Sequence, residues 1–293
     1  IMLKALVILV MIFLTGWLWS FVPWGMDNSS LTTLLAATVL IVLASFLVVA
    51  WIDVESRVVH GGHLSVVKAL LGNLILLVVF VFLRRFSASG SMELTLAVST
   101  LMLSLASLLG VVMARGVKHP SELVPVCVVA AWADLCSLTG GPTRVMVGQI
   151  SEYYSTGQQG AAPLVDDLLI KTAVAGHRLP VPLFGIADWI IVAFLSAAFI
   201  RLNLWPGPQL PQFLSRPDLA VSFKSLHVAP FGLWLALVVA HLSGRFIPGL
   251  VPICVIALVW VLVRYPQSRR LSRRELLLTG LFPLLMTLGM TML

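Results

Sequence analysis

Residues 123 to 138 read LVPVCVVAAWADLCSL, and residues 181 to 199 read VPLFGIADWIIVAFLSAAF. Each stretch is apolar and close to the length of a membrane-spanning helix. Each also contains one carboxylate, Asp134 in the first stretch and Asp188 in the second. A carboxylate near the middle of a hydrocarbon span costs about 2.5 to 3.5 kcal/mol on insertion scales. Two such residues indicate a functional site inside a membrane protein.

The composition supports the same class of protein. Of the 293 residues, 59% are hydrophobic and 11% are charged, and the mean hydropathy is +1.04. These values exclude an ordinary soluble globular domain. We therefore predict an integral, multi-pass protein of the plasma membrane or, in a prokaryote, of the inner membrane. The net charge of +7 does not indicate nucleic-acid binding, because the lysines and arginines gather at the ends of apolar runs.

Apolar runs of membrane length, broken at clusters of charge, glycine or proline, predict an all-α transmembrane bundle of about nine spans. The predicted spans cover residues 2 to 22, 31 to 52, 66 to 83, 94 to 113, 122 to 138, 183 to 200, 228 to 243, 247 to 263 and 276 to 293.

The predicted chain has three parts. Residues 1 to 120 hold about four N-terminal spans, residues 121 to 263 hold a core with both aspartates, and residues 264 to 293 form a basic connector and a last helix. With nine spans, most of the 19 lysines and arginines fall on the side of the N-terminus. By the positive-inside rule that side is cytoplasmic, and the long loop over 139 to 182 faces outward.

Helix direction predicts that the two aspartates meet. Asp134 lies near the end of one predicted span and Asp188 near the start of the next, so both lie roughly 6 to 8 Å from the same membrane face. Consecutive spans run antiparallel, and the carboxylates can then face each other at one depth.

A third element reaches the same face. The eighth predicted span begins with residues 247 to 252, IPGLVP. Its prolines and glycine leave backbone groups without helical partners, which a water-lined cavity tolerates and lipid does not. The alternative is an ordinary helix start with proline in its first turn.

Paired carboxylates have several uses. Two that lie within hydrogen-bond reach share one proton, so that one activates water while the other polarises a peptide carbonyl. The same pair can serve as the proton or cation site of a transporter, or satisfy hydrogen bonds between packed helices. Position alone leaves these three interpretations open.

The local motifs resemble a known family. The stretch 131 to 144, AWADLCSLTGGPTR, resembles the first catalytic block of the presenilin and signal peptide peptidase family, and 184 to 191, FGIADWII, resembles its second, Gly-x-Gly-Asp, block. Residues 248 to 250, Pro-Gly-Leu, are similar to its Pro-Ala-Leu motif. The sequence departs from the family pattern at Ala133, Ala187 and Gly249, and the resemblance covers roughly residues 121 to 263.

This resemblance implies a presenilin-like bundle and an aspartyl intramembrane protease that cleaves transmembrane helices or signal peptides in the lipid bilayer, without a cofactor. It implies that Asp134 and Asp188 are the catalytic pair. Substrate binding would fall to residues in the three motifs, namely Pro248, Gly249, Leu250, Gly185 and Trp132.

Other constellations carry weaker signals. Asp53 faintly resembles the first aspartate of prepilin peptidases, but it belongs to the opposite face from Asp188, so we expect a solvated helix end at Asp53, Glu55 and Arg57. His60 and His63 flank two glycines and indicate a turn, and we predict no metal site. A non-proteolytic relative that binds membrane helices is a further alternative to the protease and the transporter.

The loop over 139 to 182 joins the two spans that carry the aspartates. Residues 163 to 175, PLVDDLLIKTAVA, predict a short amphipathic helix with its charged residues facing outward, namely Asp166, Asp167 and Lys171.

Overall fold

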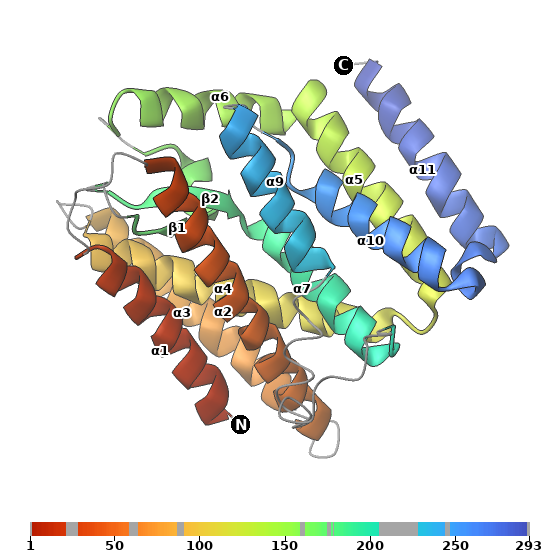
Figure 1. Ribbon diagram of the computed structural model, residues 1–293, viewed down its shortest axis with the longest axis horizontal. Helices are drawn as coiled ribbons and strands as arrows, with labels where there is room; N and C mark the ends of the chain where they lie inside the picture. Colours follow the sequence, from red (N-terminus) through yellow and green to blue (C-terminus); the bar gives the residue numbers. More distant parts are fainter. Residues whose placement is uncertain are drawn as a thin grey trace.

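The computed structural model describes residues 2–21, 29–58, 64–86, 91–158, 162–174, 177, 179–204, 228–243 and 247–291. The chain is mostly helical, as predicted. The long helices are α1 (Met2–Trp19), α2 (Ser29–Val58), α3 (Leu64–Phe86), α4 (Met92–Met113), α5 (Leu123–Thr139), α7 (Ile186–Arg201), α9 (Ala229–Ser243), α10 (Leu250–Arg264) and α11 (Arg273–Thr291). They form one bundle, with α11 at its edge beside α5 (Figure 1).

Each stretch predicted to span the membrane corresponds to one of these helices, although the stretch over 183 to 200 begins as a strand and becomes helical at Ile186. By length and composition, four segments among the described residues are suited to cross a membrane, namely Leu31–Glu55, Val67–Arg84, Met92–Gly116 and Pro120–Thr139. Three further apolar helices, Lys4–Trp19, Ala229–Ser243 and Leu250–Arg264, are shorter. The helical class is confirmed, whereas nine membrane crossings stay a prediction.

The connections hold shorter elements. These are the amphipathic helix α6 (Pro142–Ser155), the 3-10 turns η1 (Ala114–Gly116), η2 (Pro120–Glu122), η3 (Leu164–Leu168) and η5 (Pro266–Arg269), and the strands β1 (Leu169–Thr172) and β2 (Val181–Gly185). The strands pair antiparallel, with Leu169 opposite Gly185. In Figure 1, α6 and the two strands lie toward the same end of the bundle.

The helix predicted over 163 to 175 is wrong beyond residue 168. Only Leu164–Leu168 winds as a 3-10 turn, and the chain then extends into β1. The backbone of β1 finds its partners in β2, and the Lys171 N–H donates to Ser99 Oγ on α4 at 3.0 Å. Pairing with residues distant in sequence therefore replaces the internal hydrogen bonds of a helix.

The centre of the bundle is the contact between α4 and α7. A methyl group at Gly110 of α4 would lie 2.6 Å from the backbone nitrogen of Phe194 and 2.7 Å from the carbonyl oxygen of Ile190 on α7. Glycine lets the two backbones approach closely, as small residues do in membrane helix pairs. Nearby, the buried Trp189 donates its indole N–H to Ser107 Oγ at 2.8 Å. These contacts fix the helix whose first turn carries Asp188.

A buried ion cluster holds the other end of α7. Glu55 is 3% exposed and pairs with both Arg115 of η1 and Arg201 of α7. The expected solvated helix end is therefore wrong at Glu55, because two arginines distant in sequence cover and neutralise it. The cluster ties the end of α2 to the end of α7 that is remote from Asp188.

Candidate active site

Asp134 lies on α5, about one turn before that helix ends. Its carboxylate accepts a hydrogen bond from the backbone N–H of Leu250, with 3.0 Å between Oδ2 and the nitrogen. Leu250 is the first residue of α10, so this N–H belongs to the turn that has no partner inside its own helix. The carboxylate supplies the missing acceptor and joins α5 to the start of α10.

Asp188 lies in the first turn of α7, directly after β2. Its Oδ2 accepts a hydrogen bond from the Gly185 N–H at 3.0 Å, and Gly185 is the residue that caps α7. The start of a helix favours a negative charge, because its N–H groups point toward it. Strand β2 and helix α7 thus hold the carboxylate in one place.

The start of α10 lies between the two carboxylates. A methyl group at Gly249 would lie 2.7 Å from Oδ1 and 2.8 Å from Cγ of Asp188. The next residue, Leu250, donates to Asp134. Because both contacts involve one peptide unit, standard bond lengths limit the nearest oxygens of the two carboxylates to at most about 10 Å apart.

The other residues predicted for substrate binding fall in different places. Pro248 precedes this peptide unit and is half-buried. Gly185 contacts Asp188 through its N–H. Trp132 lies on the side of α5 that meets α11, where its indole N–H donates to Thr287 Oγ1 at 3.2 Å, and it is 37% exposed. The structure therefore brings Gly185, Gly249 and Leu250 to the aspartates and places Trp132 beside α11.

A second ion cluster supports the hairpin that leads to Asp188. Asp166 is 2% exposed, pairs with Lys171 of β1, lies 3.7 Å from Arg84 of α3, and accepts a hydrogen bond from the Tyr154 hydroxyl at 2.9 Å. Lys171 is 6% exposed. Burial lowers the pKa of Lys171, and the hydrogen bond that its ammonium group donates to Asp166 acts in the opposite direction. The prediction that Asp166 and Lys171 face outward is thus wrong.

Sequence reasoning missed both the hairpin and this cluster. The run over 169 to 174, LIKTAV, holds β-branched residues that favour strands. A strand reading of that run, paired with VPLFG at 181 to 185, was the available signal. The ion pairs could not be predicted from a local pattern, because the partners are far apart in sequence. Arg84, for example, lies more than 80 positions before Asp167, with which it also pairs.

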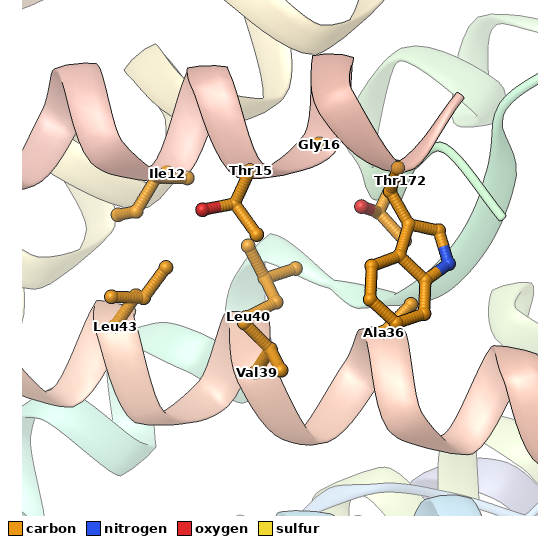
Figure 2. Close-up of a pocket in the computed structure, with 9 residues that line it drawn as sticks. Ile12, Thr15, Gly16, Ala36, Val39, Leu40, Leu43 and Thr172 are labelled. Atoms are coloured by element: carbon orange, nitrogen blue, oxygen red, sulfur yellow. The ribbon is translucent and has the colours of Figure 1, made fainter. Parts of the chain in front are cut away.

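A pocket elsewhere in the bundle does not reach the aspartates. It lies between α1 and α2, lined mainly by apolar side chains such as Ile12, Leu40 and Leu43, with the hydroxyl groups of Thr15 and Thr172 (Figure 2). Thr172 belongs to β1, so the pocket borders the hairpin through this residue. Neither aspartate lines it.

Metal ligands do not gather in the part of the chain that the structure describes, where no three His, Cys, Asp or Glu side chains are grouped closely enough to hold an ion. His60 and His63 lie outside the described residues. Comparisons with known protein families, curated proteins and solved structures found no match. The functional interpretation therefore depends on the geometry of Asp134, Asp188 and the start of α10.

Proposed function

We propose that this chain is an intramembrane aspartyl protease of the presenilin-like kind, in which Asp134 and Asp188 act as one catalytic pair. The observation that carries the proposal is the convergence of both carboxylates on the Gly249–Leu250 peptide unit. Two acids from separate helices lie beside one backbone segment. A purely structural role for either acid does not require the other to be there.

The chemistry follows from two neighbouring carboxylates that share one proton. The ionised member removes a proton from water, and the protonated member donates its proton to the oxygen of the scissile carbonyl. The water oxygen bonds to the carbonyl carbon and gives a tetrahedral diol. The carbon–nitrogen bond then breaks as the leaving nitrogen takes a proton from the aspartate that deprotonated the water, and one hydroxyl of the diol returns its proton to the other aspartate, which restores the pair with one shared proton. Both aspartates are half-buried rather than fully enclosed by the bundle.

The substrate is a transmembrane segment that has lost its helical hydrogen bonds near the cut. A peptide bond within a helix is shielded, because its carbonyl accepts from the N–H four residues later. Helix α10 begins at Leu250, directly after Pro248 and Gly249, so the N–H groups of its first turn have no acceptor within the helix, and that of Leu250 points to Asp134. An unwound substrate segment beside this backbone lies within reach of both acids.

The proposal is tested by reconstituting the full chain in vesicles with a panel of single-span substrates and identifying products by mass spectrometry. Wild type is expected to cut within the span, while Asp134→Asn and Asp188→Asn are expected to be inactive. Asp53→Asn is the matched control, because Asp53 lies near the Glu55 end of α2, remote from the pair. Cleavage that persists in both active-site variants contradicts the proposal.

The rival function is a proton- or cation-coupled transporter that uses the same carboxylates. The same vesicles distinguish it, because ion flux can be followed with an entrapped pH indicator. Flux that needs Asp134 and Asp188, together with no cleavage of any substrate, favours the transporter over the protease.

A further inference from the structure

A cluster of arginines lies where α10 ends and α11 begins. Five of them fall within eleven residues of sequence, and all five are exposed: Arg264, Arg269, Arg270, Arg273 and Arg274. Helix α10 ends at Arg264, the turn η5 covers Pro266–Arg269, and α11 starts at Arg273. The exposed Lys118 belongs to the neighbouring segment, because the turn η2 that follows it packs against η5. We call these six residues the basic patch.

Intramolecular contacts do not account for the charge of the basic patch. No ion pair within the described residues involves any of its members. The two nearby acids, Glu275 and Glu122, carry only two negative charges against the six positive charges of the patch; Glu275 accepts from Ser272 N–H and Ser121 Oγ, and Glu122 accepts from the Lys118 N–H. The patch therefore has a net positive charge.

Two of the arginines occupy positions that a helix disfavours. Arg273 and Arg274 are the first two residues of α11, and the N-terminus of a helix carries a partial positive charge. Cations there raise the energy of the helix instead of lowering it. Glu275 in the same turn accepts from the Ser272 N–H and offsets one of these charges, and a negatively charged partner outside the chain would offset the rest.

The position of the patch identifies the kind of partner. Trp260 and Tyr265 flank Arg264, whose guanidinium lies 5.7 Å from the centre of the Trp260 ring. Tryptophan and tyrosine mark the level of the lipid headgroups in membrane proteins. Beyond this level, α10 and α11 present exposed apolar side chains such as Val259 and Leu277, which suit a lipid environment. We therefore expect the arginines to lie near the depth of the lipid phosphate groups.

We propose that the basic patch is a binding site for the headgroups of anionic phospholipids. The phosphate oxygens accept hydrogen bonds from the planar, multidentate guanidinium groups of Arg270, Arg273 and Arg274. Bound lipid holds the α10–α11 turn at the membrane surface. Because the opposite end of α10 donates to Asp134, this anchor also fixes the depth at which the Gly249–Leu250 peptide lies.

Lipid selectivity measured in the membrane tests this site without any use of proteolysis. The full chain is reconstituted in phosphatidylcholine vesicles that contain a trace of spin-labelled phosphatidylglycerol or spin-labelled phosphatidylcholine. Electron paramagnetic resonance gives the fraction of each label that the protein immobilises. Wild type is expected to prefer phosphatidylglycerol several-fold, and the preference is expected to weaken in high salt, where exposed charges are screened.

The decisive variant replaces Arg270, Arg273 and Arg274 with glutamine, and its preference is expected to fall to about one. The control variant replaces Lys4, Lys68 and Arg144 with glutamine, which removes the same charge from exposed sites elsewhere, and it is expected to keep the preference. Arg→Lys replacements at the same three positions retain the charge, and they are expected to keep most of the preference for phosphatidylglycerol.

Three results overturn the proposal. They are equal immobilisation of both lipids by wild type, a preference that the triple glutamine variant retains, and an equal loss in the control variant. If the triple variant does not fold, Arg270→Gln alone is measured and is expected to reduce the preference. Inorganic phosphate, added at equal ionic strength to chloride, is expected not to release the lipid, which distinguishes a headgroup site from a site for the free anion.

Discussion

At position 249 the absence of a side chain determines how close α10 comes to Asp188. The family that this sequence resembles carries alanine at the corresponding place. In the structure the methyl group of an alanine here would lie 2.7 to 3.0 Å from three atoms of the Asp188 carboxyl group. Asp188 cannot simply rotate away, because it also accepts from the Gly185 N–H.

We predict that Gly249→Ala lowers the cleavage rate by about 10- to 100-fold, because a displacement of about 1 Å at a catalytic group has an effect of that size. The fold is expected to persist, as judged by the thermal midpoint. Gly72→Ala is the matched control, since a methyl group at Gly72 meets no atom within 4 Å. Wild-type cleavage by Gly249→Ala would show that the start of α10 is not packed against Asp188 in this way.

Lys171 shows how a single buried side chain holds the hairpin. Lys171→Met leaves the buried Asp166 without its nearest cation, which costs about 3 kcal/mol for a buried pair. We expect a loss of that order in the free energy of unfolding, measured by denaturant titration in detergent. Lys118→Met, at an exposed lysine, is expected to change it little.

A double-mutant cycle separates the pair from the rest of the cluster. Each single variant, Asp166→Asn or Lys171→Met, leaves the other member of the pair as a buried charge without its partner. The double variant removes both charges, so its loss in the free energy of unfolding is expected to be smaller than the sum of the two single losses. Additive losses would mean that the two side chains do not interact.

Among the elements, the close contact between α4 and α7 determines where the Asp188 helix lies. Gly110→Ala places a methyl group within 2.7 Å of the α7 backbone, so we expect destabilisation of about 1 to 3 kcal/mol in the free energy of unfolding. Gly280→Ala on α11, where the added methyl group meets no atom within 4 Å, serves as the control. A Gly110→Ala protein as stable as the control would contradict the packing of α4 on α7.

The helices could be predicted from sequence, and the hairpin could not, for a physical reason. An apolar run of membrane length satisfies its backbone internally, so the run itself specifies a helix. A strand of four or five residues depends on a partner, and β1 finds its partner in β2 across a connection that no local pattern specifies. The burial of charged side chains could not be predicted for the same reason. Glu55, for example, is covered by Arg201, which lies 146 positions later in the chain.

The candidate site was predictable to the extent that helix direction fixes it. Antiparallel helices placed Asp134 and Asp188 at one end of the bundle, and the count of helices placed the Pro-Gly-Leu segment there too. The sequence did not predict which residue contacts which aspartate. In the structure Leu250 donates to Asp134, and Gly249 packs against Asp188. Trp132 lies beside its aspartate in sequence but on another side of α5, because two positions along a helix are separated by about 200°.

For the whole molecule, the charge bias predicts an orientation with the N-terminus inside and the loop over 139 to 182 outside. Single cysteines at two exposed positions, Arg144→Cys and Arg270→Cys, test it in a background with Cys127, Cys136 and Cys254 replaced by serine. In intact cells a membrane-impermeant maleimide is expected to label position 144, and to label position 270 only after permeabilisation. The reverse pattern would invert the topology.

The central claim is that Asp134 and Asp188 act as a unit, and the cleavage rates of four proteins test it most directly. Wild type, Asp134→Asn, Asp188→Asn and the variant with both changes are compared on one transmembrane substrate in vesicles. Residues that act as a unit show non-additive losses, so each single change is expected to reduce the rate as much as both together. If either single variant keeps the wild-type rate, or the two losses simply add, the pair is not the catalytic centre.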